Sequence, residues 1–339
     1  MGESLRIIVD EASKTAEARR AARKMAAALG LDETLSERVG IVVTEACTNL
    51  LKHAGQGELI LHSSAEGSEA LPLLELMALD QGPGVKNLDN ALQDGYSTSD
   101  TCGTGLGAIV RLSTASDFYS IPEKGTAVLA RWCRPVDSAH SPLAATRLRV
   151  SAVNVPKTGQ DVSGDCWASV PYGDALIVLV ADGLGHGLEA HLASAEAVRI
   201  LRLNPDLSPK ALLERVHQAL RSTRGAAVAI SKIDHAREKL TFAGVGNVSA
   251  RIYSGNKVWQ NAVSVNGTAG HQCERMQEFS YPWPVDGLLQ LHSDGLTSGA
   301  SLESYPGLTL RDPALIAGVL YRDFSRGRDD STVVIAKAA

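Results

Sequence analysis

Four acidic residues in the second half of the chain stand where apolar runs begin or end. Asp182 closes the run "ALIVLVAD" and is followed by Gly183, and Asp294 closes a second run in "LLQLHSDG". Asp165 in "VSGDCW" and Asp329 in "RGRDDSTVVI" precede such runs. Oxygen ligands favour Mg²⁺ or Mn²⁺, and several carboxylates favour two ions that activate water and bind a phosphoryl group. The pattern predicts a two-metal hydrolytic centre; the alternative is a set of ordinary turn acids.

A different set of residues in the first half suits a nucleotide. Glu45 and Asn49 are four residues apart in a helical stretch, so they project from one face. The carboxylate could accept a proton from a nucleophile, and the amide oxygen could bind Mg²⁺. Asp80 ends an apolar run before the glycines of "DQGPGV", and "GTGLG" precedes a helical stretch. Such glycines let backbone N–H groups approach a phosphate at a helix N-terminus. The alternative is a solvent-exposed helix face.

Three helices are expected in the first half of the chain, and the second of them carries Glu45 and Asn49. "SKTAEARRAARKMAAALG" favours a helix that Gly30 ends. A second helix is expected to begin at a capping box formed by Thr34 and Glu37 and to end at Gly55. A third is expected from about Ala108. Apolar runs between them predict strands that end near the candidate site.

The second half combines strands and helices in another order. "DALIVLVADG" predicts a fully buried strand, and "HLASAEAVRILR" a helix. Ser208 followed by Pro209 is typical of a helix start. Further strands follow. The fold class is therefore α/β (α+β), with domains expected at residues 1–135 and 148–339 and a linker at 136–147.

The first half resembles the GHKL (Bergerat-fold) ATPases, and among them the RsbT-type anti-sigma regulatory serine kinases. The resemblance is carried by "TEACTNLLKHAG", "DQGPGV", "DGYSTS" and "GLGAIVRL". It implies a Bergerat α/β sandwich that binds ATP and Mg²⁺, with Glu45 as catalytic base, Asn49 as Mg²⁺ ligand and Asp80 as reader of the adenine. The implied nucleotide-loop glycines are Gly82, Gly84, Gly103, Gly105 and Gly107. The implied reaction is phosphorylation of a serine on a STAS-domain protein.

The second half resembles the PP2C-like SpoIIE phosphatases, and among them the RsbX-type members. "VSGDCW", "VADGLGHGLEA", "GVGN", "LHSDGLTS" and "RDDSTVVI" occur in the family's order. The resemblance implies an α/β/β/α sandwich that binds two Mn²⁺ or Mg²⁺ ions and hydrolyses phosphoserine or phosphothreonine. The implied metal ligands are Asp165, the bridging Asp182, the Gly183 carbonyl, Asp294 and Asp329, with Asp330 as the alternative to Asp329.

The chain departs from both families at specific positions. Some relatives of the first half hold the γ-phosphate with an arginine where this chain has "SDTCGTG". Many larger PP2C enzymes have a phosphate-binding arginine where this chain has "NVPKTGQD", which offers Lys157. They also have an acid for a third metal ion where this chain has Asn247. His186, between two glycines, is interpreted as structural.

The composition of the chain argues against a nucleic acid or a membrane as its partner. The 339 residues carry a net charge of −5, without the basic patch of a nucleic-acid-binding protein. No apolar run reaches the roughly 20 residues of a membrane span, and the five cysteines form no C-x-x-C pair. This composition is typical of a cytoplasmic protein. The two resemblances imply a bifunctional kinase and phosphatase that acts on STAS-domain regulators, including anti-anti-sigma or stressosome-type proteins, and a homodimer is compatible with them. Further partners would be a downstream switch protein or sigma factor. The alternative is a nucleotide-gated binding module attached to an active phosphatase.

Overall fold

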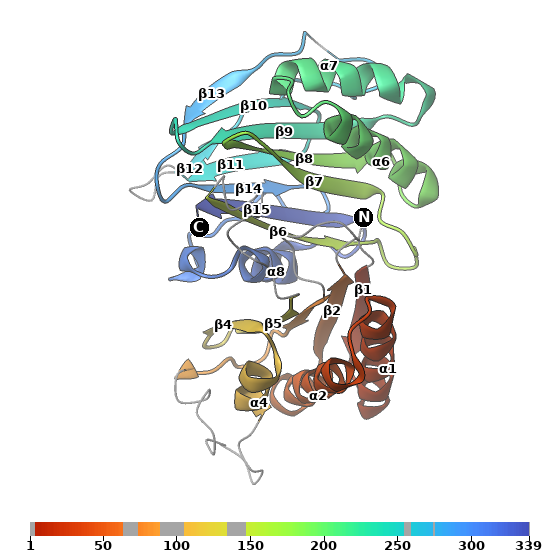
Figure 1. The fold of residues 1–339 in the computed structure, drawn as a ribbon, viewed down its shortest axis with the longest axis vertical. Helices are drawn as coiled ribbons and strands as arrows, with labels where there is room; N and C mark the ends of the chain where they lie inside the picture. Colours follow the sequence, from red (N-terminus) through yellow and green to blue (C-terminus); the bar gives the residue numbers. More distant parts are fainter. Residues whose placement is uncertain are drawn as a thin grey trace. The chain divides into compact units, whose positions relative to one another are not determined.

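The computed structural model describes residues 4–63, 74–88, 105–133, 147–253, 259–273 and 275–338. By their contacts the residues group into two compact units (Figure 1). The first unit comprises Met1–Asp137 and Leu302–Arg322, and the second comprises Ser138–Ser301 and Asp323–Ala339. Both combine helices with sheets, which confirms the mixed α/β class. No helix in the described ranges is long and apolar enough to span a bilayer. The expected linker at 136–147 lies almost entirely outside the described residues.

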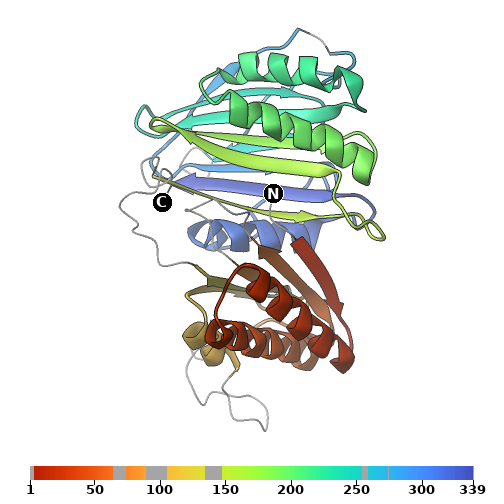
Figure 2. The ribbon, with the colours of Figure 1, turned by 45° about the vertical axis from the view of Figure 1, so that its right-hand side comes forward.

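The first unit is built on one antiparallel sheet with strand order β1-β2-β3-β5-β4. Three helices cover one face of this sheet (Figures 1 and 2). Leu74, Leu76 and Ala78 alternate along β3 and pack into that helical layer. The strands are β1 (Ser4–Val9), β2 (Gly57–Ser63), β3 (Leu74–Leu79), β4 (Ala115–Ile121) and β5 (Gly125–Trp132); the helices are α1 (Ala12–Ala28), α2 (Glu33–Asn49) and α4 (Gly105–Leu112).

The start of α2 differs from the expected capping box. Asp32 is the N-cap residue, and its carboxylate accepts a hydrogen bond from the Leu35 N–H at 2.7 Å. Thr34 therefore lies inside the first turn, and Glu37 forms an ion pair with Arg23 at 2.6 Å. The prediction of a Thr34–Glu37 box is wrong because Asp32 is the N-cap residue, and its carboxylate already accepts the free Leu35 N–H of the first turn.

The first two helical segments end at the glycines that the sequence analysis named. Gly30 has φ of 74° just after α1, as expected for a glycine that ends a helix. After Asn49 the chain continues as a π-helical turn, Leu50–Ala54, and Gly55 ends it with φ of 78°. Helix α4 begins at Gly105, three residues before the expected Ala108. The π-helical turn directly follows a candidate site residue, a position where such turns are frequent.

The opposite face of the first sheet is covered by Leu302–Arg322, a segment that comes from near the end of the chain. It contains the 3₁₀ turn Leu308–Leu310 and most of helix α8 (Pro313–Phe324). A Cβ on Gly318 would lie 2.0 Å from the Met77 sulfur, so α8 lies close against β3. Met77 alternates with the residues that face the helical layer, and it is 2% exposed. The sheet is therefore buried on both faces, which explains why every residue of β3 is buried, including Glu75.

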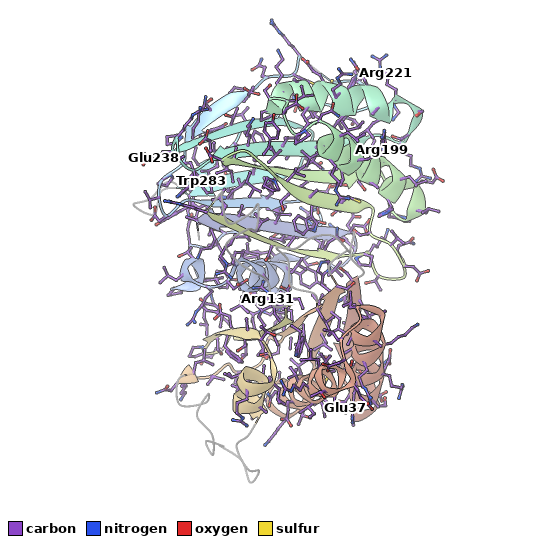
Figure 3. All side chains as sticks on the ribbon, viewed as in Figure 1. Glu37, Arg131, Arg199, Arg221, Glu238 and Trp283 are labelled. Atoms are coloured by element: carbon purple, nitrogen blue, oxygen red, sulfur yellow. The ribbon has the colours of Figure 1, made fainter. Side chains whose placement is uncertain are left out.

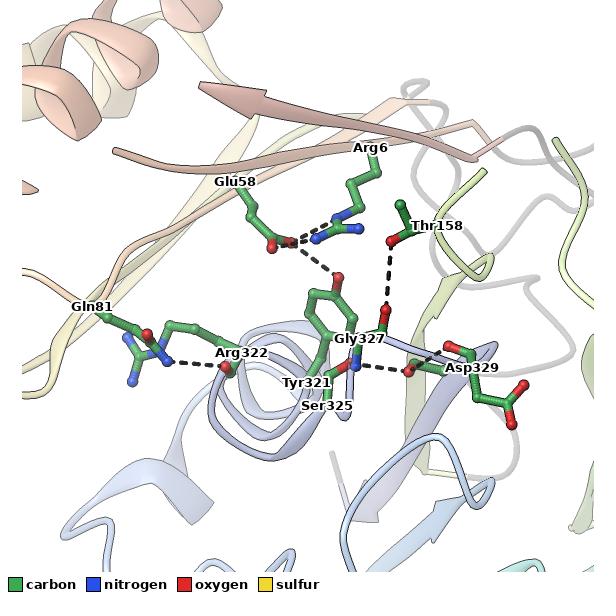
Figure 4. Close-up of polar contacts among 10 residues, drawn as sticks. Arg6, Glu58, Gln81, Thr158, Tyr321, Arg322, Ser325, Gly327 and Asp329 are labelled. Atoms are coloured by element: carbon green, nitrogen blue, oxygen red, sulfur yellow. Dashed lines mark hydrogen bonds and ion pairs between the residues drawn. The ribbon is translucent and has the colours of Figure 1, made fainter. Parts of the chain in front are cut away.

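Two polar groups fix the C-terminal segment to this face. Arg131 of β5 lies between Glu75, at 2.7 Å, and Asp312, at 2.6 Å, with side chains no more than 10% exposed. Figure 3 labels Arg131. Tyr321 donates a hydrogen bond to Glu58, which also pairs with Arg6 at 2.6 Å (Figure 4). Burial and the neighbouring Glu58 charge raise the pKa of Tyr321, so the phenol stays protonated.

The second unit contains two antiparallel five-stranded sheets, ordered β13-β10-β9-β8-β7 and β12-β11-β14-β15-β6. Helices α6 (Leu188–Leu203) and α7 (Pro209–Ala219) lie side by side over the first of these sheets (Figure 2). Its strands are β7 (Asp165–Tyr172), β8 (Ala175–Gly183), β9 (Ala226–Asp234), β10 (Lys239–Val245) and β13 (Phe279–Pro282). The other sheet has β6 (Leu148–Val155), β11 (Ser249–Tyr253), β12 (Trp259–Asn261), β14 (Leu288–His292) and β15 (Ser331–Ala338).

Strand β8 is central to both cores of the second unit. Ile177, Leu179 and Ala181 pack under α6 and α7, while Val178 and Val180 pack towards the second sheet. Both sets are at most 2% exposed, as the sequence predicted for a fully buried strand. Ser208 caps α7 by accepting a hydrogen bond from the Ala211 N–H, also as predicted. The rigid strand delivers Asp182 to the edge of the sheet.

We predict that Asp312→Ala destabilises the full chain by about 3 kcal/mol, because Arg131 stays buried and loses the carboxylate to which it donates two hydrogen bonds. The change also removes the carboxylate that accepts the Ala314 N–H at 2.9 Å at the start of α8. Urea unfolding measures the effect. Glu196→Ala is the control, because it removes only the exposed pair with Arg199, for which we expect less than about 0.5 kcal/mol. Equal effects of the two changes would contradict the proposed role of the buried pair.

Candidate functional site

Glu45 and Asn49 lie on one face of α2 and meet the start of α4. A Cβ on Gly105 would lie 3.2 Å from the Asn49 Oδ1 atom and 3.4 Å from the Glu45 Oε2 atom. A larger residue at position 105 would therefore crowd both side chains. The Asn49 Nδ2 atom is buried and has no hydrogen-bond partner within the described ranges. A buried amide without a partner is costly, so this group is suited to a ligand that supplies one.

Asp80 follows β3 and is held by backbone groups. Its Oδ1 atom accepts hydrogen bonds from the Gly82 N–H at 2.8 Å and the Thr126 N–H at 3.1 Å. Burial raises the pKa of Asp80, and these two N–H groups act in the opposite direction. The orientation of the carboxyl group is thus fixed before any ligand binds, as a group that reads one edge of a base requires.

The predicted loop glycines have different structural roles. Gly82 lies against Ala54, and Gly84, with φ of 67°, approaches the Ile121 carbonyl so closely that a Cβ would lie 2.2 Å from its oxygen. Gly107 is buried inside α4. Gly103 lies outside the described residues, as does the stretch that lacks the γ-phosphate arginine. The roles of these glycines in nucleotide binding remain predictions.

Asp165 and Asp182 are paired across β7 and β8. They are direct register partners, and Asp165 is 2% exposed. Burial, followed by the charges of Asp165, Asp294 and Asp329, raises the pKa of Asp182 to about 9. Burial, with the charges of Asp330 and Asp294 acting in the same direction, raises the pKa of Asp165 to about 7. The acids that the sequence places far apart are therefore brought within electrostatic range of one another.

Asp294 and Asp329 reach this cluster from the second sheet. The Asp294 N–H donates a hydrogen bond to the Asp182 carboxylate, and the Asp294 Oδ2 atom accepts one from Asn247 at 2.7 Å. The Asn247 amide can donate this hydrogen bond to Asp294. The acid that binds a third metal ion in many larger PP2C enzymes would instead repel the Asp294 carboxylate. The Asp329 carboxylate accepts the Asp330 N–H at 3.0 Å. In the turn that precedes Asp329, the Gly327 N–H donates a hydrogen bond to the Ser325 hydroxyl at 3.2 Å (Figure 4).

Asp330 has a different environment from Asp329. Its carboxylate accepts the Lys157 N–H at 2.8 Å, and it also accepts the Gly164 N–H. Asp330 is 4% exposed. A carboxylate occupied by two backbone donors is less available to a cation. This favours Asp329 as the ligand of the pair, and the assignment itself remains a prediction.

Gly183 is enclosed by backbone. A Cβ there would lie 2.1 Å from the Ala190 carbonyl oxygen and 2.9 Å from that of Gly164. The Gly164 carbonyl is also bound by the Ser194 hydroxyl at 2.6 Å, and His191 hydrogen-bonds to the neighbouring Ser163 carbonyl at 2.9 Å. Helix α6 therefore supports the turn on which Asp165 is placed, a role for which the sequence offered no signal.

The oxygen atoms of these carboxylates and of the Gly183 carbonyl suit a hard divalent cation, although they do not converge on a single position. In the part of the chain that the structure describes, no three His, Cys, Asp or Glu side chains are close enough together to hold one ion. The Asp165 Oδ2 atom is nevertheless buried without a hydrogen-bond partner in that same part. Like charges in a buried cluster need either protons or a cation to be stable. We therefore retain Mg²⁺ or Mn²⁺ as the ligand class and the five predicted ligands as the candidate set.

Sequence reasoning missed two contacts of Asp80, the candidate adenine-binding residue. Gly125, with φ of 95°, packs so closely on Asp80 that a Cβ would lie 1.9 Å from its carbonyl oxygen. Arg322 donates a hydrogen bond to that oxygen at 3.0 Å, and its own carbonyl accepts one from Gln81 at 3.2 Å (Figure 4). The turn "PEKGTA" is a local signal for Gly125. No local signal could reveal Arg322, because 242 residues separate it from Asp80.

Each half of the chain matches a known protein family. Residues 8–132 match the family model of the histidine kinase-like ATPase domain, and residues 172–338 match that of stage II sporulation protein E (SpoIIE). The serine/threonine-protein kinase RsbT of Bacillus subtilis is 31% identical over 119 residues, which are 34% of this chain and 87% of RsbT. The chain is a fusion of a histidine kinase-like ATPase domain and a SpoIIE domain. This confirms the resemblance of both halves.

Two further similarities concern the SpoIIE domain. The phosphoserine phosphatase RsbX of Bacillus subtilis is 26% identical over 140 residues, which are 41% of this chain and 70% of RsbX. A solved structure described as "The bacterial stressosome: a modular system that has been adapted to control secondary messenger signaling" matches with a TM-score of 0.52 at 24% identity, and covers 56% of this chain and 98% of its own. The structural match supports the fold alone.

We predict that Mn²⁺ or Mg²⁺ raises the thermal midpoint of the full chain, and more so at pH 8.5 than at pH 6. Asp182 has a pKa of about 9 in the folded, cation-free protein and 3.8 as its ordinary value. The folded state then binds more protons than the unfolded state between these values, so cation-free stability falls as pH rises through that range. A cation replaces the proton and offsets this loss.

Asp182→Asn is the matched variant for this measurement. The amide has the same size and does not titrate, so the variant should lose most of the cation-induced shift and part of the pH dependence. A shift of equal size in Asp182→Asn would show that the cation acts elsewhere.

Proposed function

We propose that the SpoIIE domain is a metal-dependent phosphoserine and phosphothreonine phosphatase. The observation that carries this proposal is the convergence of Asp165, Asp182, Asp294 and Asp329, from both sheets, at one end of the buried strand β8. Similarity to the phosphoserine phosphatase RsbX supports the choice of substrate class. Asp182 would bridge two ions, with the Gly183 carbonyl and the other three carboxylates as remaining ligands.

The residues of this domain have separable tasks. Bound divalent cations would supply an activated water for attack on phosphorus. Asn247 orients Asp294 through its 2.7 Å hydrogen bond, and Asp330 anchors the Lys157 and Gly164 backbone beside the site. Gly183 lets the turn pass close to Ala190 of α6. In this arrangement the leaving serine or threonine oxygen would take its proton from solvent.

We further propose that the ATPase domain is an ATP-dependent serine or threonine kinase. Glu45 would accept the proton of the attacking hydroxyl, Asn49 would bind Mg²⁺, and Asp80 would accept a hydrogen bond from the adenine amino group. The positive end of α4, which begins at Gly105, would face the phosphates. Support comes from the approach of Gly105 to both Glu45 and Asn49, and from the similarity to RsbT.

STAS-domain regulators of a bacterial stress or sigma-factor pathway are the proposed substrates of both domains. A kinase and a phosphatase acting on the same residue at the same time would only consume ATP. We therefore propose that the two domains act on different partner proteins, or that one domain gates the other. Equal action of both activities on one residue under one condition would contradict this.

A second candidate for the ATPase domain is a nucleotide-gated binding module that sequesters a partner. The sequence "SDTCGTG", which lacks the arginine that holds the γ-phosphate in some relatives, favours this candidate. The presence of Glu45 and Asn49 favours catalysis. ATP-dependent partner binding without any phosphate transfer would select the binding module.

For the phosphatase, we predict that Asp182→Asn lowers the rate of p-nitrophenyl phosphate hydrolysis in Mn²⁺ by at least about a hundredfold, because it removes the bridging charge that holds both ions. The matched control is Asp174→Asn, in the exposed turn between β7 and β8, which should leave the rate unchanged. Full activity of the wild-type protein in EDTA would overturn the metal-dependent mechanism.

For the kinase, we predict that Glu45→Gln lowers phosphate transfer from ATP to a STAS protein by roughly 10²- to 10⁴-fold, the usual contribution of a general base. ATP affinity should change little, because the amide keeps the shape of the side chain. Transfer is measured with radiolabelled ATP and binding by calorimetry. Glu33→Gln, in the first turn of α2, is the control. Undiminished transfer by Glu45→Gln would exclude Glu45 as the base.

A further inference from the structure

Arg224 lies at the same end of the first SpoIIE sheet as the acidic cluster. Strand β9 pairs with β8 so that Ala227 faces Asp182 and Ala226 faces Gly183. Arg224 comes two residues before Ala226, just outside the strand. A residue with no role in the predicted metal site thus stands next to the turn that follows Asp182.

The backbone around Arg224 is fixed from both sides. The Leu184 N–H donates a hydrogen bond to the Gly225 carbonyl at 3.0 Å, which ties this segment to the turn after Asp182. The Arg224 carbonyl is hydrogen-bonded to the His271 ring at 2.8 Å, and the Gly225 N–H donates to the Thr223 hydroxyl at 3.0 Å. The Arg224 side chain therefore starts from a defined position.

The guanidinium group lies over Gly185, in the turn between Asp182 and α6. A Cβ on Gly185 would lie 3.1 Å from the Arg224 Nη1 atom, and no other atom would approach within 4 Å. Gly185 has φ of 94°, which side chains rarely adopt. The glycine thus leaves the surface of the turn free for the arginine.

Arg224 is exposed, and its side chain has no ion-pair or hydrogen-bond partner within the described residues. Four carboxylates are the candidate ligands of the neighbouring metal site, and within the described residues none of them forms an ion pair with this guanidinium. A planar guanidinium with unoccupied donors is suited to binding two oxygens of a phosphate. Lys157, the cation that "NVPKTGQD" offers, carries an ammonium group without this planar fork.

We propose that Arg224 binds the phosphate group of the phosphorylated substrate, in place of the arginine absent from "NVPKTGQD". This proposal rests on the proposed phosphatase function. Arg224 approaches from the β9 side of the cluster, so it supplies the positive charge from a different element. The partner is a phosphate monoester dianion presented over the Gly183–Gly185 turn, with its ester oxygen directed towards solvent.

The test compares Arg224→Ala, Arg224→Lys and wild type in the full chain. With p-nitrophenyl phosphate and Mn²⁺, Arg224→Ala should raise KM by about tenfold or more, the usual effect of losing a charge-assisted hydrogen bond, with a smaller change in kcat. Arg224→Lys should recover part of the loss, because it keeps the charge without the planar fork. Inorganic phosphate, titrated calorimetrically into the Mn²⁺-loaded protein, should lose affinity by a similar factor.

Arg221→Ala is the matched control, because Arg221 is an equally exposed arginine one turn earlier in the chain (Figure 3). It should leave KM and phosphate affinity unchanged. Unchanged values in Arg224→Ala, or the same loss in Lys157→Ala instead, would overturn the proposal. So would loss of Mn²⁺-induced stabilisation in Arg224→Ala, which would show a structural role. If wild type hydrolyses no phosphate ester, the phosphatase function fails, and the phosphate titration still decides the role of Arg224.

Discussion

Asp165, which is 2% exposed, and the half-buried Asp182 face each other on neighbouring strands. Two carboxylates in such a position repel each other, and each also loses hydration. The protein reduces this cost only in part, through single N–H donors such as that of Asp294. A divalent cation would remove both penalties together. The cluster would therefore be more stable with a bound cation, and without one protons must take its place, so its surroundings must be rigid enough to keep the acids together.

That rigidity comes from burial of the strand that carries Asp182. Strand β8 packs α6 and α7 on one face and the second sheet on the other, so it cannot shift to relieve the repulsion. Gly183 and Gly164 let backbone segments pass where a side chain would collide. The candidate nucleotide site of the first unit also relies on glycines that allow close packing. Gly105 approaches Glu45 and Asn49 from another helix, and Gly125 closes on Asp80 from another strand.

Features that depend on neighbouring residues were predictable from the sequence. The apolar run of β8, the four-residue spacing of Glu45 and Asn49, and the Ser208 cap each follow from local periodicity or hydrogen bonding. The start of α2 was not, because Asp32 and Thr34 are both good N-caps and the sequence does not rank them. Arg131–Asp312 and the contact of Arg224 with Gly185 were also beyond reach. Such contacts depend on how the whole chain folds.

The position of Leu302–Arg322 limits how the two activities can be separated. This segment lies within the match to the SpoIIE family, yet by its contacts it belongs to the unit that contains the histidine kinase-like ATPase domain. It buries one face of the ATPase sheet and supplies Asp312 to Arg131. Seven residues after Arg322, which binds the Asp80 carbonyl, the same chain supplies Asp329 to the metal cluster. A cut at the 136–147 segment would therefore leave the ATPase domain without one layer of its core. If such an ATPase fragment were inactive, the missing layer of its core would be sufficient to explain the loss. The result would say nothing of the chemistry of either domain.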